Sequence, residues 1–130
     1  MSGSLPGLAA VAAGGALGAS LRYGVGLAAK SGFGESFPYG TLSVNLLGCL
    51  LIGFAAGLLP EGAGSRASLR LFVIVGCLGG FTTFSSFGLE TLRLIDASRL
   101  AAAAGYVLAS NIGGVLLCLV GAWASGLLTR

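Results

Sequence analysis

The sequence predicts an all-α membrane protein with four transmembrane helices, and three observations support this fold class. Hydrophobic residues make up 55% of the 130 residues and charged residues only 8%, whereas soluble domains carry about 25% charged residues. The mean hydropathy is +0.97. Four apolar segments, at about residues 5–27, 38–59, 70–92 and 100–127, are each long enough to cross a bilayer. The loops between them are short, so we expect one domain over residues 1–130.

The composition also excludes several kinds of site. The chain contains no histidine, the commonest metal ligand and general base. Cys49, Cys77 and Cys118 lie in apolar segments without disulfide or metal-ligand spacing, and we interpret them as small buried hydrophobic side chains. The net charge of +3 rests on few groups and on no basic run, so we expect no nucleic-acid partner.

The first span begins near residue 5 without a basic region before it, so we interpret it as a retained helix and not as a cleaved signal peptide. Gly14 and Gly18 form a pair that allows a second helix to approach closely. Arg22 and Tyr23 near its end are typical anchors at the membrane interface. Arg22 could instead face a water-filled vestibule and attract anions. Residues 30–37 are predicted to form a polar loop.

The second span carries Thr41, Asn45 and Cys49 one helical turn apart on a common face. An amide in hydrocarbon costs several kcal/mol unless it is hydrogen-bonded. Considered alone, Asn45 is therefore more easily explained as a hydrogen bond between helices than as a functional group. Gly53 and Gly57 form a second pair for close helix packing. Residues 61–70 are predicted to be a loop that contains Arg66 and Arg70.

The third span contains the stretch around which the chain is organised, GGFTTFSSF at residues 79–87. Glycine costs a helix about 1 kcal/mol, and Ser and Thr side chains compete for backbone hydrogen bonds. Irregular backbone at membrane depth persists only where it is buried in protein or lines a wet cavity. We therefore predict that the helix breaks at residues 79–83 and that the freed carbonyl and hydroxyl groups are functional.

The fourth span follows a predicted short loop containing Arg93, Asp96 and Arg99. Tyr106, Ser110 and Gly114 recur at every fourth position and so share one helix face. Together with Asn45 and the predicted break, polar groups then occur near mid-depth on three of the four helices. This distribution indicates a pathway across the membrane more than a set of isolated contacts between helices.

The basic residues hardly distinguish the two sides of the membrane. With four crossings, one side receives Arg66, Arg70 and Arg130, and the other side Lys30, Arg93 and Arg99, with Arg22 nearby. The Lys/Arg bias of short loops sets the orientation of a membrane protein, and here that bias is almost absent. We therefore predict that the chain inserts in both orientations and works as an antiparallel homodimer, which supplies the walls that four short helices lack.

The polar groups in the spans suit an anion. No carboxylate lies deep in a span, Glu90 being the nearest, which argues against proton or cation antiport. The uncharged donors are the Asn45 amide and the hydroxyl groups of Thr82, Thr83, Ser85, Ser86, Tyr106 and Ser110. Phe84 and Phe87 are normally explained by packing. Their electropositive ring edges could also replace part of the hydration of a small anion.

Three segments carry a family resemblance: GGALGASLRY at 14–23, GTLSVNLLG at 40–48 and GCLGGFTTFSSF at 76–87. In this order, in a chain with four spans, they resemble the small bacterial fluoride channels of the Fluc or CrcB family over nearly the whole sequence. The resemblance implies a multi-pass protein of the cytoplasmic membrane that releases fluoride passively, with no catalysis. It also implies an antiparallel, dual-topology homodimer with two fluoride pores.

The resemblance further implies roles for individual residues. Phe84 and Phe87 look like the pore-lining phenylalanines, and Asn45 like the asparagine that faces the ion. The other implied positions are Tyr106 and Ser110 in a polar row, Thr41, Thr83 and Glu90 along the path, and Arg22 at the anion vestibule. The Gly79 and Thr82 carbonyl groups of both chains would hold a structural sodium ion at the dimer centre. Gly114 stands where some relatives carry a hydroxyl group.

A small proton-coupled multidrug antiporter of dual topology is the alternative function. Such transporters can also form antiparallel dimers of four-helix chains. The first span here has no glutamate that could exchange protons for a cationic drug, so the sequence favours the channel.

Overall fold

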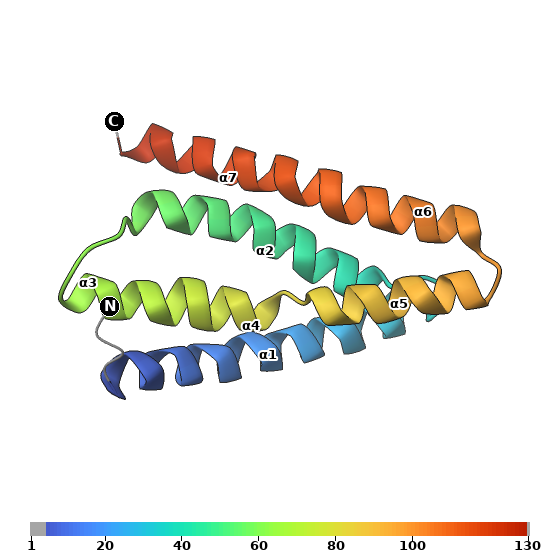
Figure 1. Ribbon diagram of the computed structural model, residues 1–130, viewed down its shortest axis with the longest axis horizontal. Helices are drawn as coiled ribbons and strands as arrows, with labels where there is room; N and C mark the ends of the chain where they lie inside the picture. The colour runs from blue at the N-terminus through green and yellow to red at the C-terminus, as the bar shows by residue number, and fades with distance from the viewer. Residues whose placement is uncertain (1–4, 130) are drawn as a thin grey trace.

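The computed structural model describes residues 5–129 and consists of helices that lie side by side as four long rods (Figure 1). The first rod is α1 (Leu5–Phe33) and the second is α2 (Tyr39–Leu58). The third contains α3 (Ser65–Arg70), η1 (Leu71–Leu78), α4 (Gly79–Phe81) and α5 (Phe84–Asp96). The fourth contains α6 (Leu100–Leu108), η2 (Ala109–Gly113) and α7 (Gly114–Leu128). All four rods are long and apolar enough to cross a membrane, which confirms the predicted fold class. Arg130, used above in the charge comparison, lies outside the described residues.

Glycines allow two pairs of helices to approach closely, α1 with η1 and α2 with α7. A Cβ atom at Gly14 would collide with the Phe72 carbonyl oxygen, and one at Gly18 with the Cys77 carbonyl oxygen. Likewise, a Cβ atom at Gly53 would collide with the backbone of α7. Close backbone approach through small residues is the usual way in which membrane helices pack. The packing roles predicted for these glycines are confirmed.

The first loop is shorter than predicted, because α1 continues through Lys30 to Phe33 instead of ending near residue 27. The helix ends at Gly34, whose φ of 78° is readily adopted only by glycine and gives a common helix terminus. Lys30 then reaches past the helix end to form an ion pair with Glu35, with Nζ and Oε1 3.1 Å apart. The polar residues after residue 27 therefore belong to the end of α1. A prediction from hydropathy assigns such residues to a loop because they are not apolar.

The second and third predicted loops are also too long. Arg66 and Arg70 belong to α3, where the Arg70 guanidinium donates to the Leu59 carbonyl oxygen at 2.6 Å and so satisfies the end of α2. Arg93 and Asp96 belong to α5, which leaves only residues 97–99 as the turn before α6. A membrane helix can continue into the aqueous layer, because charged side chains are solvated there. The first charged residue after an apolar run therefore does not mark the end of the helix.

Two residues between α4 and α5 have extended backbone conformations: Thr82 with φ −84° and ψ 160°, and Thr83 with φ −154° and ψ 123°. Residues 79–81 are helical, so the interruption is shorter than the predicted break at residues 79–83. The Thr83 hydroxyl accepts a hydrogen bond from the Ser86 backbone N–H at 3.2 Å and thereby caps α5. The wide turns of η1 and η2 were not predicted, and such π-helical segments occur often at functional sites.

Candidate functional site

The extended residue Thr83 is held by a side chain from another helix. The Asn45 Nδ2 group on α2 donates to the Thr83 carbonyl oxygen at 2.9 Å, and the Thr83 N–H donates to Asn45 Oδ1 at 2.8 Å. One amide thus satisfies both backbone groups of a residue that has left the helical ladder. The amide has a second N–H besides the one that contacts the Thr83 carbonyl oxygen. Asn45 therefore connects the helices and still has one donor to offer.

The same arrangement withdraws two carbonyl oxygens from helical hydrogen bonding. The Thr83 N–H would close a helical turn onto Gly79 O, but it donates to Asn45. The Ser86 N–H would close one onto Thr82 O, but it donates to the Thr83 hydroxyl. Thr82 O instead accepts from Arg22 Nη1 at 3.3 Å. A carbonyl oxygen has two lone pairs, so this contact leaves Thr82 O able to accept one more partner.

Carbonyl oxygens are the appropriate ligands for a hard cation at this position. Within residues 5–129, no three Cys, Asp or Glu side chains lie close enough together to hold a metal ion. Backbone oxygens suit alkali cations, as the selectivity filters of potassium channels illustrate. The two carbonyl oxygens of Gly79 and Thr82 are too few to complete the shell of a hard cation, which takes about six or more oxygen ligands. Carbonyl oxygens suit a hard cation such as sodium, whereas the Arg22 guanidinium at Thr82 O places a positive charge beside them that opposes such an ion.

The aromatic residues of the site form a row. The ring centroids of Phe84 and Phe87 are 5.5 Å apart, and those of Phe87 and Tyr106 are 5.1 Å apart. Phe37 packs edge-on against Tyr106 with centroids 5.5 Å apart. Tyr106 is fully buried, Phe87 is 9% exposed and Phe84 is 80% exposed. The structure thus brings both predicted phenylalanines beside the polar row, and only Phe84 lacks cover from its own chain.

Glu90, which the family resemblance places along the path, is the centre of the polar contacts at the end of this row. Thr41 Oγ1 donates to Glu90 Oε1 at 2.8 Å, and the Tyr106 hydroxyl donates to Glu90 Oε2 at 2.7 Å. Two predicted donors from different helices therefore share one carboxylate. A helical count places Glu90 two turns beyond Phe84, but the sequence does not reveal which hydroxyl groups face it.

A hollow of about 290 Å³ adjoins the extended residues. Asn45, Thr83, Phe87 and Ser110 line it together with Gly48, Cys49, Ile52, Thr82, Phe84 and Asn111. The Ser110 Oγ atom is buried, and no hydrogen-bond partner for it is present among residues 5–129. Buried hydroxyl groups are normally paired, so a group without a partner beside a hollow suits a ligand that accepts hydrogen bonds.

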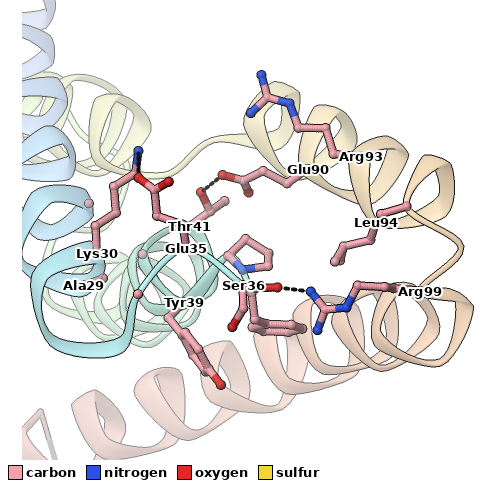
Figure 2. Close-up of a pocket in the computed structure, with 16 residues that line it drawn as sticks. Ala29, Lys30, Glu35, Ser36, Tyr39, Thr41, Glu90, Arg93, Leu94 and Arg99 are labelled. Atoms are coloured by element: carbon pink, nitrogen blue, oxygen red, sulfur yellow. Dashed lines mark hydrogen bonds and ion pairs between the residues drawn. The ribbon is translucent and has the colours of Figure 1, made fainter.

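A second hollow of about 420 Å³ adjoins the hydrogen bond between Thr41 and Glu90, and both residues line it. Figure 2 shows the Thr41–Glu90 hydrogen bond, the Lys30–Glu35 ion pair and the contact of Arg99 with the Ser36 carbonyl oxygen. Arg93 also lines it. The basic side chains Lys30, Arg93 and Arg99 outnumber the acidic Glu35 and Glu90, so this mouth favours anions.

The predicted site residues form two connected groups and one pair of carbonyl groups. Asn45, Thr83, Phe84, Phe87 and Ser110 line the inner hollow. Thr41 and Glu90 line the outer hollow, and Tyr106 joins the two groups by its contacts with Phe87 and Glu90. Thr82 lies in the extended segment, with Arg22 bound to its carbonyl oxygen, and Gly79 lies in the helical turn before it.

Comparison with known proteins identifies the family. Residues 9–122 match the family described as "CrcB-like protein, Camphor Resistance (CrcB)". A protein of Anaeromyxobacter sp. named "Fluoride-specific ion channel FluC" is 48% identical over 123 residues, which are 92% of each chain. Proteins of the same name from Chloroflexus aurantiacus and Helicobacter pylori are 45% and 47% identical, each over 112 residues. These matches cover 86% of this chain and 89% of the Chloroflexus protein, and 85% of this chain and of the Helicobacter protein. With its motifs, its four apolar helices and these relatives, the chain belongs to the CrcB family.

Proposed function

We propose that this protein is a fluoride-selective channel that lets fluoride leave the cell passively across the cytoplasmic membrane. It is a multi-pass membrane protein and a channel, not an enzyme, as the names of its relatives indicate. The observation that carries the proposal is the row of uncharged donors beside aromatic rings, which ends in the unpartnered Ser110 hydroxyl. The relatives give no support to the multidrug antiporter.

The row of donors suits fluoride for a physical reason. Fluoride is a small, strongly hydrated acceptor, so it enters a narrow path only where protein donors replace its water. The Ser110 hydroxyl, the second Asn45 N–H and the Phe87 ring edge supply positive ends without a fixed charge that would trap the ion. Fluoride enters cells from acidic surroundings as neutral hydrogen fluoride, ionises inside and needs such a path to leave.

Glu90 gives the path its outer end. Its carboxylate accepts hydrogen bonds from the Thr41 and Tyr106 hydroxyl groups. A fluoride ion that passes would have to accept a hydrogen bond from each of these hydroxyl groups in its place. The basic mouth beyond Glu90 would then raise the local anion concentration.

The proposal includes an antiparallel, dual-topology homodimer with two pores. The basic residues are divided almost evenly between the two ends of the helices. Phe84 is 80% exposed although it adjoins the donor row, and Gly79, five residues before it, is exposed as well. A second chain laid against this segment would cover Phe84 and complete the wall of the inner hollow.

The interruption of the third span at Thr82 and Thr83 would serve to hold the two chains of this dimer together. The Gly79 and Thr82 carbonyl groups of both chains would hold one sodium ion at the dimer centre. This ion would fix the two chains together and would not be transported. Arg22 at Thr82 O lies at the same segment and adds positive potential at the inner end of the path.

Fluoride efflux from liposomes tests the proposed function. Vesicles containing only the purified chain are loaded with potassium fluoride or potassium chloride, and release is followed with ion-selective electrodes after addition of a potassium ionophore. We expect fast fluoride release and negligible chloride release. Equal release of both anions, or no fluoride release from well-folded protein, would contradict the proposal. Proton-coupled uptake of a cationic drug would point to the antiporter instead.

The dimer and its orientation need a separate measurement. A cysteine-free chain with one cysteine at the C-terminus is labelled from outside intact cells and again after the cells are opened. Insertion in both orientations predicts that about half of the termini react from each side. Labelling from one side alone would exclude the dual topology while leaving the channel activity open to its own test.

A further inference from the structure

The polar row on the fourth rod has a gap at Gly114. Tyr106, Ser110 and Gly114 follow one another at every fourth position on one face, and Gly114 is buried without a side chain. A Cβ atom built there would lie 3.2 Å from the sulfur of Cys49 on α2, and no other heavy atom is recorded as close. The Cys49 thiol therefore borders the space that the next side chain of the row would occupy.

Cys49 also faces the inner hollow. It follows Asn45 by one helical turn on the same face of α2, and it lines the hollow together with Asn45 and Ser110. The Ser110 hydroxyl is buried, and no hydrogen-bond partner for it is present among the described residues, so this hollow suits a ligand that accepts hydrogen bonds. Cys77 and Cys118, in contrast, do not line either hollow. Two independent observations, the position opposite Gly114 and the lining of the hollow, thus select one of the three thiols.

We propose that the Cys49 thiol lines the permeation path as its third polar group, after the hydroxyl groups of Tyr106 and Ser110. Mercury compounds that bind thiols should therefore block this channel. The inference rests on the proposed channel function. A thiol is a weaker hydrogen-bond donor than a hydroxyl group, so this step of the path holds fluoride less strongly than Ser110 does. A thiol is also a soft ligand that binds soft metals tightly. Methylmercury chloride would form a sulfur–mercury bond, the thiol proton would pass to water and chloride would leave.

A pair of size-matched substitutions tests the role in permeation. Serine and alanine have similar volumes, but only serine donates a hydrogen bond. Cys49→Ser should therefore conduct fluoride at least as fast as the unmodified chain, and Cys49→Ala should be at least fivefold slower than Cys49→Ser. Cys77→Ser is the control, because Cys77 lies at the contact of η1 with α1, and it should leave the rate within twofold. Equal rates for Cys49→Ser and Cys49→Ala would overturn the proposed role.

Block by methylmercury chloride tests access to the thiol. A chain with Cys77→Ser and Cys118→Ser keeps only Cys49 and should lose at least nine-tenths of its fluoride efflux. Cys49→Ser keeps the other two thiols and should remain active. Block that persists in Cys49→Ser would overturn the inference. Mass spectrometry of the treated protein gives a readout independent of flux: rapid labelling of Cys49 supports its access even if the chain conducts no fluoride, and slow labelling overturns it.

Discussion

Asn45→Asp is the substitution that separates the two roles of Asn45 most clearly. The new carboxylate keeps an acceptor for the Thr83 N–H, now at 2.8 Å from Asn45 Oδ1. It loses the donor to the Thr83 carbonyl oxygen, now at 2.9 Å, and places two oxygens against each other. It also adds a negative charge to the lining of the inner hollow.

The added charge dominates the expected effect. Two unit charges about 4 Å apart, at an effective dielectric constant of about 20, interact by about 4 kcal/mol. The lost hydrogen bond contributes only about 1 kcal/mol net. Each 1.36 kcal/mol is about tenfold in rate, so the charge alone predicts a loss of about a thousandfold. The Arg22 guanidinium at Thr82 O offsets part of this repulsion. We therefore expect fluoride efflux to fall at least a hundredfold.

The liposome efflux assay measures this effect, and two further variants separate the contribution of the added charge from that of the lost hydrogen bonds. Asn45→Ala removes both hydrogen bonds but adds no charge, so its loss of efflux should be smaller than that of Asn45→Asp. Gly62→Asp adds the same charge in the open loop between α2 and α3 and should leave efflux within twofold. If Asn45→Asp conducts as well as Asn45→Ala, the assignment of Asn45 to the ion path is wrong and only its contact with Thr83 remains.

Three further predictions concern the rings, the helix packing and the cation. Phe84→Ile or Phe87→Ile should reduce fluoride efflux at least tenfold without dissociating the protein on gel filtration, because isoleucine has no electropositive ring edge; undiminished efflux in both would remove the rings from the path. Gly18→Val should abolish the yield of folded protein, because its Cβ would collide with the Cys77 carbonyl group, whereas Gly24→Val, with open space around it, should not. Replacement of sodium by a large organic cation should slowly silence efflux, and activity that survives prolonged sodium removal would exclude the structural ion.

The four helices could be predicted from composition, because every crossing needs a long apolar run and the chain has four of them. The helix ends could not. α1 passes through Lys30, and α5 passes through Arg93 and Asp96, because charged side chains remain in water while the backbone continues its helical hydrogen bonds. Capping residues mark these ends better than hydropathy does. Gly34 at the end of α1 is an example.

The site was predictable as a set of residues but not as a set of contacts. Spacing along α2 placed Thr41, Asn45 and Cys49 on one face, and both hollows are lined from that face. The pairing of Thr41 and Tyr106 with Glu90 depends on the crossing of three helices, which periodicity within one helix does not encode. The position of Cys49 opposite Gly114 depends in the same way on the α2–α7 contact.

The hydrogen bonds between Asn45 and Thr83 have a consequence for how the chain assembles. The partner that satisfies the backbone of Thr83 lies 38 residues away and on another helix. While the third rod is alone in the bilayer, a continuous helix is its only way to satisfy these groups. We therefore expect this rod to enter the membrane as an unbroken helix and to unwind at Thr83 only when α2 docks. Its local opening would then report that the bundle has formed.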